Sequence, residues 1–109
     1  MTVGFELDGQ VFTALNGGPV FKFTEAIWLV VNCDTHKQID TYWDKLCADG
    51  GKPLQCGWLK DKYGLSWQIV PSILPKLMQD TNKSERVMQA LMQMVKLDIK
   101  TLQQAYDAK

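Results

Sequence analysis

This chain has no surplus of positive or negative charge, no long apolar run, three cysteines and one histidine. Twelve lysines and arginines balance twelve aspartates and glutamates among its 109 residues. A neutral chain has no positive surplus for a phosphate backbone, so we exclude nucleic acid as the main partner. The longest apolar run, AIWLVV, is far shorter than the roughly 20 residues of a membrane span, and no secretory signal opens the chain. These absences predict a cytoplasmic protein without a membrane partner.

The few reactive side chains do not form a recognisable catalytic set. Cys33, Cys47 and Cys56 are an odd number of cysteines at wide spacing, which excludes a disulfide framework and a CxxC metal knuckle and predicts free thiols. His36 is the only histidine, and we expect it to be exposed in the first turn of a helix. Ser66 lacks the glycine elbow and histidine base of a triad nucleophile. Because no pair of residues resembles an acid and a base, the sequence favours binding over catalysis.

Asp8-Gly9 separates two alternating runs at the N-terminus and predicts a two-residue β-hairpin, because glycine accepts the positive φ of a type I′ turn. Closing this turn creates one apolar hairpin face by pairing Leu7 with Gln10, Phe5 with Phe12 and Val3 with Ala14.

Residues 26–55 predict a strand, a helix and a short strand. The run Ala26–Asp34 is almost continuously apolar, so we expect both of its faces to be covered. Thr35 or Asp34 is the expected cap of the helix that follows. The sequence ADGG at 48–51 ends that helix, and a short strand is expected at 52–55. The apolar positions of the helix recur at helical spacing and are Ile39, Tyr42, Trp43 and Leu46.

Two strands joined by the turn KDKYG form the most informative segment, CGWLKDKYGLSWQIVP at 56–71. In the second strand Ser66, Gln68 and Val70 lie on one face, whereas Trp67 and Ile69 lie on the other. A polar group inside an apolar run is typical of a strand that borders a pocket. Trp67, like Trp43, is expected in the core.

The C-terminal part predicts three helices. A short helix is expected at 73–79, a longer one capped by Asn82 or Ser84, and a last one that begins at Asp98 and carries Leu102 and Tyr106. The expected apolar face of the longer helix consists of Val87, Met88, Leu91, Met92 and Val95. The stripe of Met88, Met92 and Met94 is typical of a core or a dimer surface.

The segments FTALNGGPVFKFTEAIWLVVNCDT, IDTYWDKL and GWLKDKYGLSWQIVP resemble the PhnB-like branch of the vicinal oxygen chelate superfamily, which also contains glyoxalase I and bleomycin-resistance proteins. The resemblance implies an α+β fold in which two βαβββ modules curl around a shared cavity. It places a single domain at 1–109, with the end of a first module at 1–18, a βαβββ module at 26–71 and a helical segment at 72–109. The opening strand and helix of the first module are missing from this pattern.

A sheet that lacks a neighbouring strand exposes an edge of unpaired backbone groups. We therefore expect a homodimer, formed by pairing of edges or by exchange of the hairpin. The alternatives are a poorly soluble fragment and a monomer whose C-terminal helices cover the gap.

The resemblance also implies positions for a divalent metal, and this chain departs from them. The glutamate near the end of the last strand corresponds to Gln68, and two further ligand positions correspond to Ala26 and Ala14. Alanine offers no lone pair and a neutral glutamine is a weak ligand, so we expect no metal and no other cofactor. Glyoxalase I and dioxygenase activities are therefore unexpected.

The expected function is metal-independent binding of a small, partly aromatic molecule in the cup of the sheet. The alternatives are a metal-independent enzyme of the same superfamily and a truncated product with only an assembly role. The expected ligand-binding residues are Gln68, Trp28, Trp58, Phe12 and Ser66. Core packing is the competing interpretation for Trp28 and Trp58, and structural hydrogen bonding is the competing interpretation for Gln68.

Overall fold

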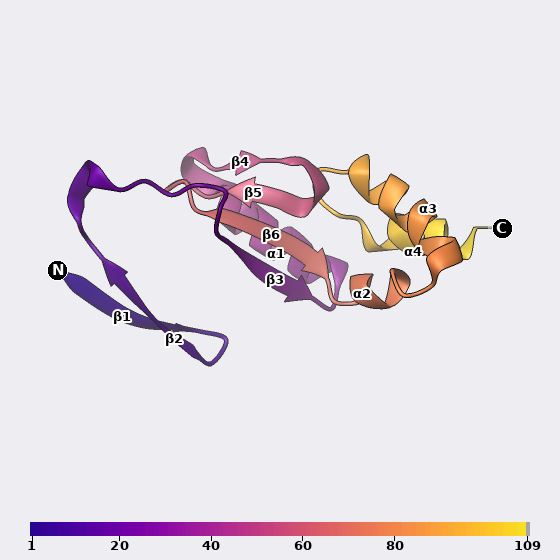
Figure 1. Cartoon of the computed structure of the whole chain (residues 1–109), viewed down its shortest axis with the longest axis horizontal. Helices are drawn as coiled ribbons and strands as arrows, with labels where there is room; N and C mark the ends of the chain where they lie inside the picture. The colour runs from indigo at the N-terminus through magenta and orange to yellow at the C-terminus, as the bar shows by residue number, and fades with distance from the viewer. Residues whose placement is uncertain (109) are drawn as a thin grey trace.

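The computed structural model describes residues 1–108 and shows a mixed α+β protein, as the sequence predicts. A two-stranded sheet at the N-terminus is followed by a four-stranded sheet and then by helices (Figure 1). The strands are β1 (Thr2–Leu7), β2 (Gln10–Leu15), β3 (Trp28–Cys33), β4 (Lys52–Pro53), β5 (Trp58–Lys60) and β6 (Ser66–Pro71). The helices are α1 (His36–Cys47), α2 (Leu74–Leu77), α3 (Thr81–Met92) and α4 (Ile99–Asp107), with short 3₁₀ turns at η1 (Gly18–Val20), η2 (Ala48–Gly50) and η3 (Gln55–Gly57).

Strands β1 and β2 form the predicted hairpin. Their register pairs Leu7 with Gln10, Phe5 with Phe12 and Val3 with Ala14, which confirms the prediction. Asp8 and Gly9 both have positive φ, 49° and 81°, as a type I′ turn requires. The rings of Phe5 and Phe12 stack across the strands with their centroids 5.6 Å apart.

The four-stranded sheet has the order β3-β6-β5-β4, in which β3 runs parallel to β6 and the other neighbours are antiparallel. Helix α1 packs on one face through a buried cluster of Cys33, Ile39, Trp43, Leu59 and Ile69. The predicted cap of α1 is confirmed. Thr35 accepts from the backbone N–H of Gln38, and the Gln38 side chain accepts from the Thr35 backbone N–H in a capping box.

The C-terminal helices form a second core at one end of the sheet. Val70 of β6 packs there with Leu77, Val87, Leu91, Leu97 and Leu102. The backbone N–H groups of Cys56 and Gly57 donate to the carbonyls of Met94 and Val95, which joins this helical part to the sheet. Asp98 caps α4 as predicted, because its carboxylate accepts from the backbone N–H of Thr101.

The longer helix differs from its prediction in its cap and its exposed side. Asp80 caps α3, whose first residue Thr81 precedes both expected caps; its carboxylate accepts from the backbone N–H of Asn82. Val87 and Leu91 are buried, but Met88 and Met92 are exposed. Val95, which was expected on the same helical face, lies beyond the end of α3 and is also exposed. The reason is that α3 packs on its neighbours through a narrower stripe than its apolar positions would allow.

Strand β3 differs from the expectation that both faces of residues 26–34 are covered. Cys33 is buried and Leu29 and Val31 are half-buried on the α1 side, whereas Trp28 is 43% and Val30 48% exposed on the other. The sequence is apolar on both faces, but only one face has a neighbour within residues 1–108.

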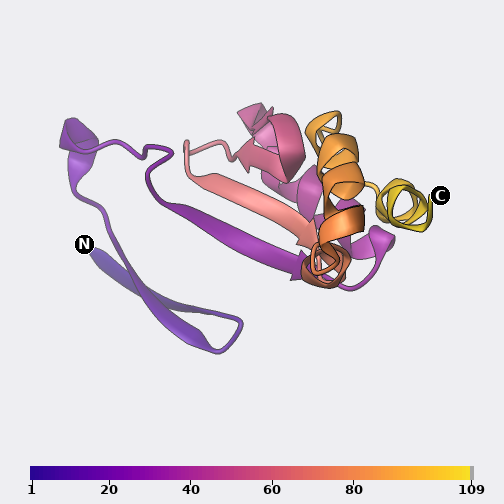
Figure 2. The ribbon, with the colours of Figure 1, turned by 45° about the vertical axis from the view of Figure 1, so that its right-hand side comes forward.

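The hairpin stands apart from the rest of the chain (Figures 1 and 2). The molecule measures 56 × 27 × 24 Å with a radius of gyration of 16.0 Å, whereas a compact chain of this length has a radius of about 13 Å. The apolar hairpin side chains Val3, Phe5 and Leu7 remain 39–53% exposed. None of the helices within residues 1–108 has the length and the apolar composition of a membrane span.

Candidate functional site

Four of the five predicted binding residues lie on the face of the sheet opposite α1. The register pairs Trp28 of β3 with Ser66 of β6, and Gln68 of β6 with Trp58 of β5. Directly paired residues point to the same side of a sheet. The structure therefore brings Trp28, Ser66, Gln68 and Trp58 onto one surface.

An aromatic pair dominates this surface. The rings of Trp28 and Trp58 lie with their centroids 4.5 Å apart and their planes tilted by 54°. Such tilted contacts are favourable for aromatic rings, and they hold both side chains in defined positions. Because Trp28 remains 43% exposed, part of its ring is open to a further planar group.

Two polar side chains lie beside the aromatic pair on strand β6. The Ser66 hydroxyl is buried, and within residues 1–108 it has no hydrogen-bond partner. The Gln68 side chain donates from Nε2 to the carbonyl of Cys56 over 3.3 Å, which fixes the orientation of its amide. An unpartnered buried hydroxyl is unusual and marks a position where a polar partner would be favourable.

Charged groups continue the surface along one row of the sheet. Lys60 of β5 is paired with Ser66, and Lys52 of β4 is paired with Lys60. The ammonium group of Lys60 donates to the carboxylate of Glu25, which lies in the segment before β3. This contact with Lys60 lowers the pKa of Glu25, first through the hydrogen bond and then through the opposite charge.

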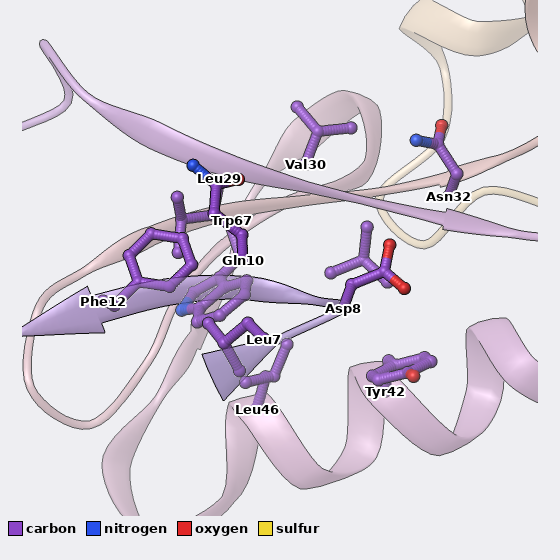
Figure 3. A pocket seen from close by; sticks show the side chains of 11 residues that line it. Leu7, Asp8, Gln10, Phe12, Leu29, Val30, Asn32, Tyr42, Leu46 and Trp67 are labelled. Carbon is purple, nitrogen blue, oxygen red and sulfur yellow. The ribbon is translucent and has the colours of Figure 1, made fainter. Parts of the chain in front are cut away.

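Phe12, the fifth predicted residue, lies at a separate pocket of about 720 Å³ on the α1 side of β3 (Figure 3). There the hairpin faces the outer edge of β3 and the side of α1. Trp67 also lines this pocket and is only half-buried, so it belongs to the core less completely than predicted. The remaining lining comes from Leu7, Asp8, Gln10, Leu29, Val30, Val31, Asn32, Tyr42 and Leu46.

Tyr42 differs from its prediction as a core residue of α1. It is 46% exposed, because it faces the gap beneath the hairpin rather than the sheet. A second pocket of about 950 Å³ continues along the same hairpin face, between Phe5 and the β5–β6 turn at Tyr63. Both pockets exist because the hairpin does not pack closely on the body of the chain.

The residues at the metal positions that the resemblance implies do not fit a divalent ion. The side chains of Ala14 and Ala26 have no donor atom, and the neutral amide oxygen of Gln68 is a weak ligand on its own. No group of three or more histidine, cysteine, aspartate or glutamate side chains gathers for a metal within residues 1–108. The part of the chain that the structure describes therefore offers no set of ligands through which a metal-dependent step could be derived.

The remaining reactive groups have structural surroundings. All three cysteines are free thiols, as predicted, and burial raises the pKa of Cys33 and Cys47. His36 is exposed as predicted, and its Nε2 lies 3.4 Å from Oδ1 of Asp40. Asp40 also accepts from Lys96, which lowers the pKa of its carboxyl group.

Sequence analysis did not identify the charged residues of this surface. They are Lys60 and Lys52 in the row and Glu25 in the segment before β3. Lys60 was placed in a charged turn, but it is the last residue of β5. Strand alternation is the signal that could have placed Lys60 on this face. Leu59 is buried, so its neighbours Trp58 and Lys60 lie together on the other side of the sheet. The position of Lys52 required the strand register.

Comparison with known proteins agrees with the resemblance seen in the sequence. The family model described as 3-demethylubiquinone-9 3-methyltransferase matches residues 1–70. Among solved structures, the PhnB protein from Bacillus cereus is 37% identical, with a TM-score of 0.60. The match covers 65% of this chain and 64% of that chain, so this chain spans less than two thirds of its relative's length. A search of curated proteins found no match. The chain belongs to the 3-demethylubiquinone-9 3-methyltransferase family, in its PhnB-like branch.

Proposed function

We propose that this chain is a metal-independent binding protein for a small, partly aromatic molecule, held on the sheet face that carries Trp28 and Trp58. The observation that carries the proposal is the exposed Trp28 ring beside a buried hydroxyl, Ser66, that has no partner within residues 1–108. Small-molecule sites combine such aromatic area with a few polar groups that fix orientation. The family membership is consistent with this role.

Binding is favoured over catalysis by the chemistry of the face. Lys60 and Glu25, the charged residues near the aromatic pair, form an ion pair with each other. A general acid or base must instead be free to reach a proton of the substrate. The aromatic pair and the Gln68 amide supply contact and orientation, which are the requirements of a binding site.

We propose that the chain forms a homodimer through the hairpin and the edge of β3. On this proposal, β3, α1, β4, β5 and β6 make up one βαβββ module, and the hairpin belongs to the other module. Within residues 1–108 the outer edge of β3 has no paired strand, and the apolar side chains of the hairpin are exposed. A second copy that packs between this hairpin face and β3, on the α1 side of the sheet, would cover both features.

Native mass spectrometry of the purified protein, compared with its denatured mass, tests both parts. The expected result is a dimer that carries additional small-molecule mass, which is reduced in Trp28→Ala. The matched control is Met92→Ala, which truncates a large side chain that is 59% exposed on α3, away from the sheet face and from both pockets. A monomer without added mass would contradict the proposal, and added mass equal to a divalent metal would contradict its metal independence.

The dimer contact has its own variant pair. Phe12→Glu places a charge on the hairpin face that we propose to be covered, whereas Val11 points to the other side and is 77% exposed. We expect Phe12→Glu to shift the protein to monomer in light scattering after size-exclusion chromatography, and Val11→Glu to leave the dimer intact. Equal behaviour of the two variants would refute the proposed position of the interface.

A further inference from the structure

One row across the four-stranded sheet changes from aromatic to cationic. In the order of the strands it reads Trp28, Ser66, Lys60 and Lys52, each residue directly paired with the next. Directly paired side chains share a face, so an aromatic ring, a hydroxyl and two ammonium groups follow one another on one surface.

The cationic end of this row is incompletely neutralised. Lys60 is paired with Glu25, but Lys52 makes no ion pair within residues 1–108. Two lysines directly opposite each other repel, and such pairs destabilise a sheet. A positive charge therefore remains at the end of the row where an anionic group would be favourable.

Glu25 is placed so that another anion can replace it. Its side chain is 65% exposed and belongs to a segment without regular structure, whereas Lys60 is held on a strand and is 31% exposed. Exposed ion pairs contribute little to stability because solvent screens both charges, so one carboxylate can replace another at Lys60 at low cost.

We propose that the ligand is a planar aromatic molecule that carries a carboxylate, with its rings on Trp28 and its carboxylate on Lys60 and Lys52 in place of Glu25. This inference rests on the proposed binding function. Neighbouring strands lie about 4.8 Å apart, so Trp28 and Lys60, two strands apart, are separated by roughly 10 Å at the backbone. A two-ring aromatic acid spans this separation, across Ser66 of the intervening strand.

Isothermal titration calorimetry with 2-naphthoate and its neutral amide, 2-naphthamide, tests the inference. The two probes share their shape and differ in charge. We expect the acid to bind about tenfold more tightly than the amide at low salt, since a charge-assisted hydrogen bond contributes about that factor. We expect the preference to weaken at high salt, because the lysines are partly exposed.

Three variants localise the effect. Lys60→Met should abolish the preference for the acid without changing the affinity for the amide, and Glu25→Gln should strengthen binding of the acid severalfold. Lys100→Met, on α4, removes the same charge at an exposed position away from the sheet and should leave the preference unchanged. Circular dichroism confirms that each variant is folded.

The outcomes separate the two proposals. Equal binding of acid and amide by the unmodified protein would refute the anionic ligand and leave the aromatic binding function standing. Binding of neither probe would refute both. A preference that persists in Lys60→Met but disappears in Lys100→Met would also overturn the inference, because the anion would then be held elsewhere.

Discussion

Replacing Ser66 by alanine should stabilise the protein. The Ser66 hydroxyl is buried and unpartnered within residues 1–108. A buried polar group without a hydrogen bond costs about 1–3 kcal/mol, and alanine removes the group while keeping the Cβ. The lost oxygen forfeits only a few dispersion contacts, each worth about 0.1–0.2 kcal/mol. We therefore expect Ser66→Ala to raise the free energy of unfolding by about 1 kcal/mol.

The matched control is the same substitution six residues away. The Ser72 hydroxyl donates to the carboxylate of Asp34 over 2.6 Å. Its removal should lower the free energy of unfolding by about 1 kcal/mol, the usual net contribution of a hydrogen bond. The two alanine substitutions should therefore change the free energy of unfolding in opposite directions.

Urea denaturation at one fixed protein concentration measures both changes, because the apparent stability of the proposed dimer would depend on concentration. A loss of more than about 0.5 kcal/mol in Ser66→Ala would falsify the reasoning, since it would mean that the hydroxyl contributes a bond. If the proposed function is right, the same variant should also bind its ligand less tightly while being more stable. Such an exchange of stability for function is common at binding sites.

Three further predictions concern the supporting structure. Gly57→Ala should destabilise the protein by about 1–3 kcal/mol more than Gly64→Ala in urea denaturation. Both glycines have positive φ, but of the two only Gly57 has backbone where a Cβ would lie, because the Ile69 carbonyl oxygen would be 2.8 Å away. Equal losses in the two variants would contradict this prediction. Leu102→Ala should lower the free energy of unfolding by about 2–5 kcal/mol, because Leu102 is fully buried. Thermal unfolding measures the loss, and a change below about 1 kcal/mol, as expected of a surface site, would contradict the packing. The lowered pKa of Asp40, caused chiefly by Lys96, should stabilise the fold above the ordinary aspartate pKa of about 3.9 and lose that effect as pH falls through the lower folded value. Stability measured against pH should show a weaker acid dependence in Asp40→Asn, and an unchanged curve would refute the contact.

Local chemistry made parts of the fold predictable. The hairpin register followed from Asp8-Gly9, because a two-residue turn leaves one pairing of the flanking residues. The caps Thr35 and Asp98 were found for a similar reason, since a cap bonds to backbone groups only two or three residues away. The cap of α3 was predicted wrongly because residues 80–84 hold several acceptors, and Asp80 starts the helix earliest.

The candidate site was only partly predictable. Face alternation correctly grouped Ser66 with Gln68, because alternation is a property of a single strand. It did not show that Lys60 and Lys52 extend the row, since this depends on the pairing of β4, β5 and β6. Phe12 was expected beside the tryptophans in one binding site, whereas the hairpin carries Phe12 to the opposite side of β3.

The sequence alone therefore determined the order of the elements, the hairpin register, the helix that packs through Ile39 and Trp43, and the family. These features rest on neighbours close in the chain or on the residues themselves. Only the tertiary structure decided that one face of β3 stays open and that the hairpin stands apart. The physical reason is that an apolar side chain favours burial, but its apolar character does not determine which surface of the protein packs against it.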